Sequence, residues 1–365
     1  MTLKSLPPDI ILDILSRLPT ESVLDCKLVC KRLLSLLTSR RNQFAEMHHR
    51  RQLLQLANGE FGNAAASSSV VKMGLMFSIL LDEEKDSVGP RLYYGDKYND
   101  EMNIHDSFSY KTLKKTSISY PLIKTGIPKN VIVGSLNGLI CLNRYHDGIL
   151  DPIYICNPMT GEYVKLPKHT LSPQNYIGAF GFGYIHSITT VYKVVRIYYE
   201  KFEDYAVGEV QVYTIGSGSG WRTIGRTSYY LCFPQHVGIF ANGALNWLEN
   251  KNIVAFSLAD EEFRLVQQVP CLNHNLRNCT YGLQALGGNL CLCLQNISEH
   301  LLEIWSLKGT GPQESWSREF SIDLANMFPC VPLLLTKKNE VLLVHEGATL
   351  YCYEPENNYL DKILG

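Results

Sequence analysis

The chain has 365 residues, of which 45% are hydrophobic, 19% charged and 10% aromatic, so it can bury a sizeable core and is neither disordered nor collagen-like. Its formal net charge of -1 gives no overall attraction to nucleic acid or to an anionic membrane. No apolar run approaches the roughly 18 residues of a membrane span, and Asp9 and Asp13 interrupt the apolar N-terminal stretch, so we expect a soluble protein of the cytoplasm or nucleus without a secretory signal.

The composition changes sharply along the chain. Residues 1–58 contain no glycine and one aromatic residue, Phe44, and their nine basic and five acidic residues give a net charge of +4. All 27 glycines, 21 tyrosines and four tryptophans lie in the remainder, whose net charge is -5. We therefore predict a helical domain over 1–45, a helical connector over 46–70 and a β domain over 71–365.

Three short helices are predicted in the first domain. Pro8 suits the first turn of a helix, where its missing N–H costs nothing, and Pro19 ends that helix. Thr20 can cap a second helix, and a third begins near Lys31. Their apolar residues include Ile10, Ile11, Ile14, Leu15, Leu18, Val23, Leu24, Leu28, Val29, Leu33, Leu34, Leu36 and Leu37. A bundle of about 40 residues cannot bury so many apolar side chains by itself, so a partner surface is expected to cover some of them.

These helices resemble a known family. Leu6 to Pro19 reads LPPDIILDILSRLP, and the later VCK at 29–31 completes a motif similar to the F-box. The family usually has tryptophan three residues after Cys30, where this chain has Leu33. The resemblance implies docking on a Skp-type adaptor and, through it, on a cullin. The candidate adaptor-binding residues are Leu6, Pro7, Ile10, Ile14, Leu18, Pro19, Leu24, Leu28, Val29, Cys30 and Leu33.

The residues that follow the third helix are basic and lack helix breakers. Between Arg40 and Asn58 there is neither glycine nor proline, which predicts a rigid helical connector. The basic stretch from Lys27 to Arg51 has no aromatic residues suited to base stacking, so we expect it to face acidic residues of the adaptor rather than nucleic acid.

The second part repeats one unit. Strand-like segments rich in Val, Ile and Leu begin at Asn137, Tyr192, Asn242, Gly288 and Asn339, which are 55, 50, 46 and 51 residues apart. A second strand, a polar turn and a third strand follow each segment. Such units bury their faces by stacking, which favours a β-propeller-like ring of about six blades, with five as the alternative. Residues 71–81 and 91–95 would form the sixth, degenerate unit.

An aromatic residue recurs in the last strand of each unit. These residues are Tyr163, Trp221, Phe263, Trp316 and Tyr359. Because they occupy one position per unit, we expect them to pack between blades rather than to form a ligand site.

The same segments are similar to plant F-box proteins with a C-terminal F-box-associated interaction (kelch-like) domain. The matching motifs are Gly134–Ile140, Cys156–Tyr163, Gly181–Tyr184, Tyr192–Val195, Asn242–Leu248, Phe256–Phe263 and Glu314–Trp316. This resemblance and the F-box together cover almost the whole chain. They imply that the β domain recognises a target protein.

Signatures of catalysis and of metal binding are missing. The sequence has no Gly-x-Ser-x-Gly and no His-Glu-x-x-His, and the glycine-rich run 216–220 leads into Trp221 rather than into a helix. The eleven cysteines are odd in number and lie in apolar segments, which indicates reduced, buried thiols. Cys26 with Cys30, and Cys291 with Cys293, lack further ligands at zinc spacing. We expect no metal, no cofactor and no enzymatic activity.

The sequence therefore predicts the non-catalytic substrate-recognition subunit of a Skp–cullin–F-box ubiquitin ligase, which recruits a target protein for ubiquitination and proteasomal degradation. The alternative is a β-propeller interaction scaffold outside a ubiquitin ligase, and an enzyme within the propeller comes third. The candidate target-binding loops are 98–130, 168–178, 201–208 and 226–236. Neither a nucleic acid nor a membrane is expected as a partner.

Overall fold

The computed structural model divides the chain into two compact units, Met1–Met73 and Gly74–Gly365, each described by itself. We call them the helical unit and the β unit. The structure describes residues 7–18, 20–39, 43–48, 50–51, 73–79, 91–98, 114–115, 129–146, 149–158, 160–168, 176–185, 190–200, 207–232, 235–273, 276–309, 311–325, 327–336, 338–347 and 349–364.

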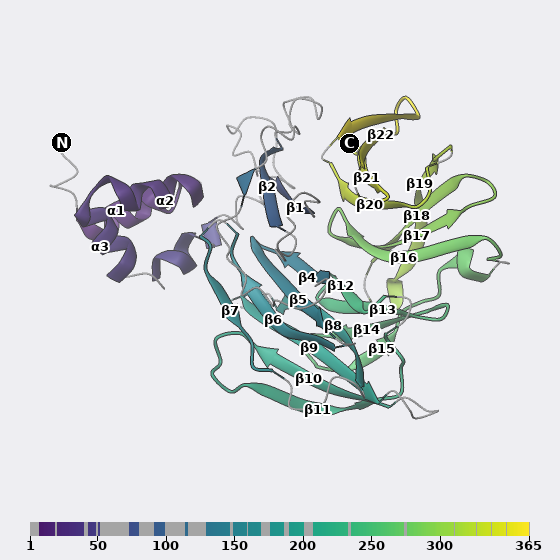
Figure 1. Cartoon of the computed structure of the whole chain (residues 1–365), viewed down its shortest axis with the longest axis horizontal. Coiled ribbons are helices and arrows are strands. Elements are labelled where there is room, and N and C mark those ends of the chain that lie inside the picture. The colour runs from purple at the N-terminus through teal and green to yellow at the C-terminus, as the bar shows by residue number, and fades with distance from the viewer. Residues whose placement is uncertain are drawn as a thin grey trace, which may run out of the picture. The chain divides into compact units, whose positions relative to one another are not determined.

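The helical unit contains the three expected helices (Figure 1). They are α1 (Pro8–Leu15), α2 (Thr20–Val29) and α3 (Lys31–Ser39). Pro8 occupies the first turn of α1, where no intrahelical N–H bond is lost. The core of the unit is formed by Ile11, Leu12, Leu15, Val23, Leu33, Leu37 and Phe44. Helices this short are stabilised mainly by packing of their apolar faces.

The chain after α3 continues the helical unit beyond the expected boundary at residue 45. Residues 43–48 and 50–51 are helical. Met47 packs against the core, and His48 is buried with its Nε2 2.9 Å from the carbonyl oxygen of Leu18. The first residues of the expected connector therefore belong to the packed bundle. The rest of that connector, 52–70, lies outside the described residues.

The β unit repeats a four-stranded antiparallel sheet with the predicted period of about fifty residues. Each sheet contains the three predicted strands and one further strand that precedes them. Sheet 1 has β4 (Lys129–Leu136), β5 (Leu139–His146), β6 (Ile149–Cys156) and β7 (Tyr163–Lys165). Sheet 2 has β8 (Tyr176–Ile185), β9 (Val191–Glu200), β10 (Gly208–Thr214) and β11 (Trp221–Thr227). Sheet 3 has β12 (Val237–Ala241), β13 (Ala244–Glu249), β14 (Asn252–Ser257) and β15 (Phe263–Leu265). Sheet 4 has β16 (Cys279–Leu286), β17 (Asn289–Asn296), β18 (Leu301–Lys308) and β19 (Ser315–Asp323). Sheet 5 has β20 (Cys330–Leu335), β21 (Val341–His345), β22 (Thr349–Glu354) and β23 (Tyr359–Leu364).

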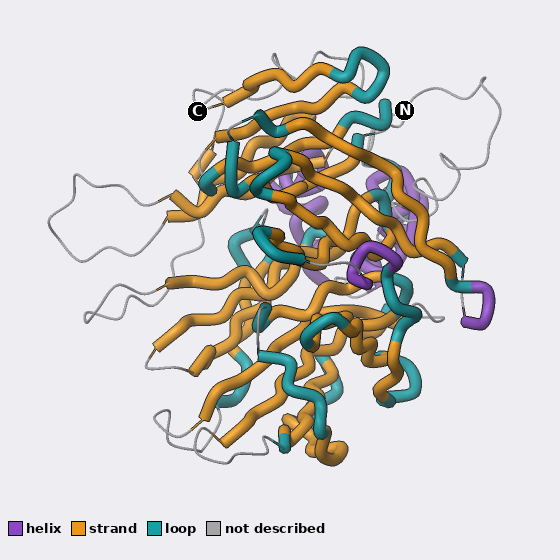
Figure 2. Tube along the Cα trace, turned by 90° about the vertical axis from the view of Figure 1, so that its right-hand side faces the viewer, coloured by secondary structure: helices purple, strands orange, loops and turns teal. Residues whose placement is uncertain are grey.

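The first strands of successive sheets are neighbours. Contacts join β4 to β8, β8 to β12, β12 to β16 and β16 to β20. Between sheets 2 and 3 the contact is a parallel pairing of Phe180 with Val237, which joins them into one eight-stranded sheet. Figure 2 shows the described part of the β unit as strands joined mostly by short turns. This succession of sheets around their first strands is the arrangement expected of a propeller.

A further sheet precedes these five. It has β1 (Met73–Ile79), β2 (Arg91–Tyr98) and β3 (Lys114–Lys115). It corresponds in chain position to the degenerate unit expected at 71–81 and 91–95. The count of about six blades stays a prediction, because most residues between β2 and β4 lie outside the described ranges.

Asn-Gly pairs form two of the tight turns between the first and second strands of a sheet. Asn137 and Gly138 link β4 to β5 with φ values of 50° and 78°, and Asn242 and Gly243 link β12 to β13 with 52° and 74°. Both pairs have the positive φ values that two-residue hairpin loops require. The largest side chains pack between neighbouring sheets, as Trp247 does between sheets 2 and 3.

Candidate functional site

Helix α1 divides its apolar residues between two faces. Ile11, Leu12 and Leu15 are buried in the core of the helical unit. Ile10 and Ile14, one helical turn apart, stay 48% and 47% exposed. The helix therefore presents a short apolar stripe away from its own core.

Helices α2 and α3 also have exposed apolar side chains. Leu28 and Val29, the last residues of α2, are 86% and 71% exposed, and Leu34 on α3 is also exposed. We call Ile10, Ile14, Leu28, Val29 and Leu34 the exposed apolar set. So many large exposed apolar side chains on one small bundle are typical of an interaction surface.

The other adaptor-binding candidates are placed differently. Pro7 and Cys30 are exposed, and Leu18 and Leu24 are half-buried. Leu6 and Pro19 lie outside the described residues.

Leu33 is a correction to the sequence analysis. Its side chain is 4% exposed and packs in the core, so it is not available to a partner. The helical spacing of Leu33 and Leu37 turns both inward and leaves Leu34 outside. The periodicity of α3 was the signal that could have identified Leu34.

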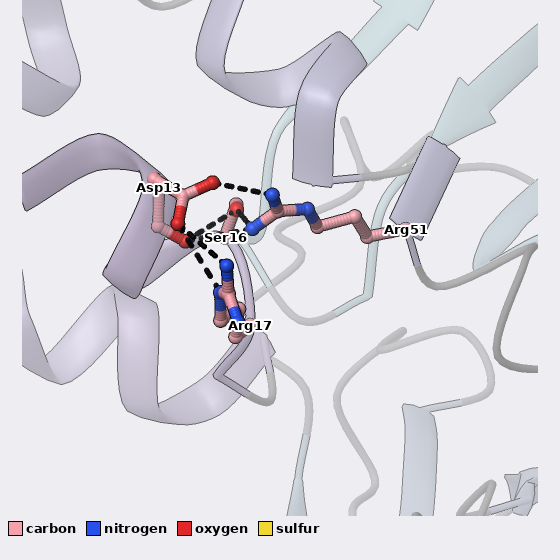
Figure 3. Close-up of polar contacts among 4 residues, drawn as sticks. All are labelled: Asp13, Ser16, Arg17 and Arg51. Carbon is pink, nitrogen blue, oxygen red and sulfur yellow. Dashed lines mark hydrogen bonds and ion pairs between the residues drawn. The ribbon is translucent and has the colours of Figure 1, made fainter. Parts of the chain in front are cut away.

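Polar contacts tie the end of α1 to the helix after α3 (Figure 3). Arg51 Nη1 lies 2.8 Å from the backbone oxygen of Asp13 and 2.5 Å from Ser16 Oγ, and Arg51 Nη2 pairs with Asp13 Oδ1. Arg17 Nη2 donates to Asp13 Oδ2 at 2.8 Å. Hydrogen bonds from Arg51 and Arg17 lower the pKa of the Asp13 carboxyl group. We call Asp13, Ser16 and Arg51 the Arg51 clamp.

Two of the five recurring aromatic residues of the β unit connect neighbouring sheets, whereas Tyr163 and Tyr359 are largely exposed. Trp221 Nε1 on β11 donates to the carbonyl oxygen of Pro167, just after β7, at 2.8 Å. Trp316 Nε1 on β19 donates in the same way to Gln267, just after β15, at 2.8 Å. These two indoles hold the last strand of one sheet to the sheet before it, as expected for packing between blades.

The cysteines show the burial that the sequence predicts. All eleven are free, and most of them are buried. Burial raises the pKa of Cys141 and of Cys293 well above the ordinary value, which keeps both thiols protonated. Among the described residues no group of three or more histidine, cysteine or acidic side chains could hold a metal. The described helices include none long and apolar enough to cross a membrane.

The expected target-binding loops lie largely outside the described residues. The segment after β11 is described in part, and it is held by Tyr199. The Tyr199 hydroxyl donates to the carbonyl oxygen of Tyr229 at 2.8 Å and accepts from the Leu231 N–H at 3.2 Å. The Tyr230 N–H donates to Glu249 Oε1 at 2.7 Å, and the Tyr230 side chain is exposed.

Both units match the models of known protein families. Residues 3–44 match the F-box domain, and residues 92–363 match the F-box associated beta propeller domain. The chain belongs to the family of F-box proteins with an F-box associated β-propeller domain. This pairing supports the role of a substrate receptor in a Skp–cullin–F-box complex.

The chain is also similar to F-box proteins from Arabidopsis thaliana. F-box protein At3g07870 is 27% identical, and the match covers 97% of this chain and 86% of that protein. F-box protein CPR1 is 25% identical over 98% of this chain and 84% of that protein. Among solved structures, oligogalacturonate lyase in complex with manganese matches with a TM-score of 0.42 and 12% identity over 76% of this chain and 71% of that chain. That likeness is too low to bear on the function.

Proposed function

We propose that this chain is the substrate-recognition subunit of a Skp–cullin–F-box ubiquitin ligase. The helical unit binds a Skp-type adaptor, which connects it to a cullin, and the β unit binds the protein that is ubiquitinated and degraded by the proteasome. The exposed apolar set on a bundle that already has its own core is the observation that carries the proposal. This exposed surface supports adaptor binding independently of the family assignment.

The energetics are consistent with docking through this set. Fully burying one Leu, Ile or Val side chain contributes about 1.5–3 kcal/mol. Association costs on the order of 4–15 kcal/mol in lost freedom of motion. Leu28 and Val29 are the most exposed members, so their burial contributes most per residue.

In this proposal the chain contributes proximity rather than bond chemistry. The receptor holds a lysine of its target near a conjugating enzyme that the cullin positions, which raises the local concentration of the reacting groups. We also propose that the protein acts in the cytoplasm or nucleus, which imaging of a fluorescent fusion would test.

The test is a charge substitution in the exposed apolar set of the full-length chain. Leu28→Asp with Val29→Asp places two carboxylates in the contact, and we expect the affinity for a purified Skp-type adaptor to fall at least about 100-fold. The matched control is Gln43→Asp with Ala45→Asp, which adds the same charge at exposed positions outside the set. Calorimetric titration of the adaptor measures both variants.

Equal adaptor affinity in the charged variant and in the control would overturn the proposal for this surface. If the unaltered chain does not bind any Skp-type adaptor, the scaffold outside a ubiquitin ligase becomes the better description. Unfolding curves of the β unit must be the same in both variants, since neither substitution lies in it.

A further inference from the structure

The helical unit extends beyond the part that matches the F-box. The family match ends at residue 44, whereas residues 45–48 and 50–51 continue as helix. This extension carries His48, which contacts the Leu18 carbonyl oxygen at 2.9 Å, and Arg51. His48 reaches back over 30 residues to Leu18, just after α1, and Arg51 reaches back over 38 residues to Asp13 of α1.

Arg51 makes the stronger of these connections (Figure 3). Its guanidinium group contacts the Asp13 carboxylate, the Asp13 backbone oxygen and the Ser16 hydroxyl oxygen. Ser16 is fully buried and its hydroxyl donates to the same Asp13 backbone oxygen at 2.7 Å. One planar guanidinium group that donates to three acceptors fixes both the distance and the angle between α1 and the helix at 43–51.

We propose that Arg51 is a positioning residue: the Arg51 clamp joins the helix at 43–51 rigidly to α1 and thereby fixes the direction in which the chain leaves the adaptor-binding bundle. The clamp lies outside the exposed apolar set, so it acts on presentation of the β unit and not on adaptor affinity. The consequence for ubiquitin transfer rests on the proposed function, whereas the rigidity of the helix does not.

Arg50 provides a matched control on the neighbouring position. Its side chain is exposed, and Arg50→Ala removes the same charge and a similar apolar stem. Arg51→Lys keeps the charge but loses the planar guanidinium group that contacts three acceptors. We therefore compare three variants of the full chain: Arg51→Ala, Arg51→Lys and Arg50→Ala. The comparison distinguishes loss of the clamp from loss of a positive charge.

Hydrogen exchange of the backbone amides at 43–48 measures the rigidity directly. We expect Arg51→Ala to speed exchange there by roughly tenfold or more, Arg51→Lys to restore part of the protection, and Arg50→Ala to leave it unchanged. Exchange in α2 and α3 should stay the same in all three. Equal exchange in Arg51→Ala and Arg50→Ala would overturn the proposal, as would a general loss of protection in the bundle.

A reconstituted ligase tests the consequence for transfer. A lysine-bearing peptide fused to the C-terminus of the full chain serves as the acceptor, so no natural target is needed. Arg51→Ala should bind the Skp-type adaptor as tightly as Arg50→Ala yet transfer ubiquitin to the peptide at least about threefold more slowly, because the acceptor samples a wider volume. Equal transfer rates would contradict the positioning role, whereas failure of the unaltered chain to bind the adaptor would contradict the proposed function instead.

Discussion

Gly238 on β12 lies where the indole of Trp247 covers the first strand of sheet 3. A Cβ at this position would clash with Trp247 Cε2, and Trp247 is fully buried. We predict that Gly238→Ala destabilises the β unit by about 1–3 kcal/mol, because a well-packed interior resists added volume. Urea unfolding followed by tryptophan fluorescence measures the change.

Gly134 on β4 supplies the control for this substitution. A Cβ there would lie 3.4 Å from Phe182, which is an ordinary contact distance. Gly134→Ala should therefore cost much less than Gly238→Ala. Equal unfolding midpoints for the two variants would contradict this prediction and show that Trp247 can move aside without lowering the stability of the β unit.

Glu261 is a second residue whose environment makes a measurable prediction. Its Oε1 lies 2.8 Å from Lys193 Nζ and 2.7 Å from Arg222 Nη2. Burial alone would raise the pKa of Glu261, but the hydrogen bonds from Lys193 and Arg222 outweigh it and lower the pKa below its ordinary value of 4.5. The ion pair therefore contributes stability above that value, and this contribution is lost as the pH falls through the lowered pKa.

We predict that Glu261→Gln destabilises the β unit by about 2 kcal/mol at neutral pH, because Lys193 is buried and loses its charged partner. The difference from the unaltered chain should shrink as the pH falls from about 5 toward 3, where the native carboxylate becomes protonated. Glu262→Gln, at the exposed neighbouring position, should show little difference at any pH. Unfolding curves across this pH range decide the matter, and a difference that grows at low pH would refute the assignment.

At the scale of elements, the last strands of neighbouring sheets share a repeated ion pair. Arg222 follows Trp221 on β11 and pairs with Glu261, two residues before Phe263. Arg264 follows Phe263 on β15 and pairs with Glu314, two residues before Trp316. The same offsets from the recurring aromatic residue thus connect sheet 2 to sheet 3 and sheet 3 to sheet 4.

The Arg264–Glu314 pair can be measured by a double-mutant cycle. The two guanidinium nitrogens lie 3.0 and 2.6 Å from the two carboxylate oxygens, a bidentate geometry. We predict that Arg264→Ala and Glu314→Ala are coupled by about 1 kcal/mol in the free energy of unfolding.

A pair within one sheet is the reference for that cycle. Lys308 and Glu319 of sheet 4 lie 3.3 Å apart with both side chains well exposed. Their coupling should stay below about 0.5 kcal/mol, as for ordinary surface pairs. Equal coupling energies in the two cycles would mean that the ion pairs between sheets contribute no more than surface contacts.

At the scale of the whole molecule, the helical unit extends to residue 51, and this determines which residues between the two units can be replaced without disturbing the bundle. We predict that a Gly-Ser segment in place of residues 46–58 weakens adaptor binding and lowers the helix content, because Met47 packs on the core of the helical unit and His48 contacts the Leu18 carbonyl oxygen. Replacement of residues 52–58 alone should leave adaptor binding unchanged. Far-ultraviolet circular dichroism and adaptor titration distinguish the two replacements, and identical behaviour would show that the bundle ends near residue 45.

Local chemistry determined much of this protein from the sequence alone. Pro8 predicted the start of α1, because a proline with its fixed φ and missing N–H suits the first turn of a helix. The spacing of about fifty residues predicted repeated antiparallel sheets, since one unit cannot bury its own faces. The motif from Leu6 to Pro19 predicted the family.

Tertiary structure alone decided which of several equivalent apolar or polar residues face inward. Leu33 and Leu34 are chemically identical neighbours; the periodicity of α3 places them on different faces, but only the packing of the bundle shows that the face with Leu33 is buried and the face with Leu34 is exposed. Gln295 likewise reaches from β17 to both backbone polar groups of Cys330 in the next sheet, a contact 35 residues away in sequence. In the sequence, Arg51 is one of several basic residues between Lys27 and Arg51. Only the structure shows that it is the one that contacts Asp13. Such pairings depend on where distant segments meet, and local conformational preferences carry no information about that.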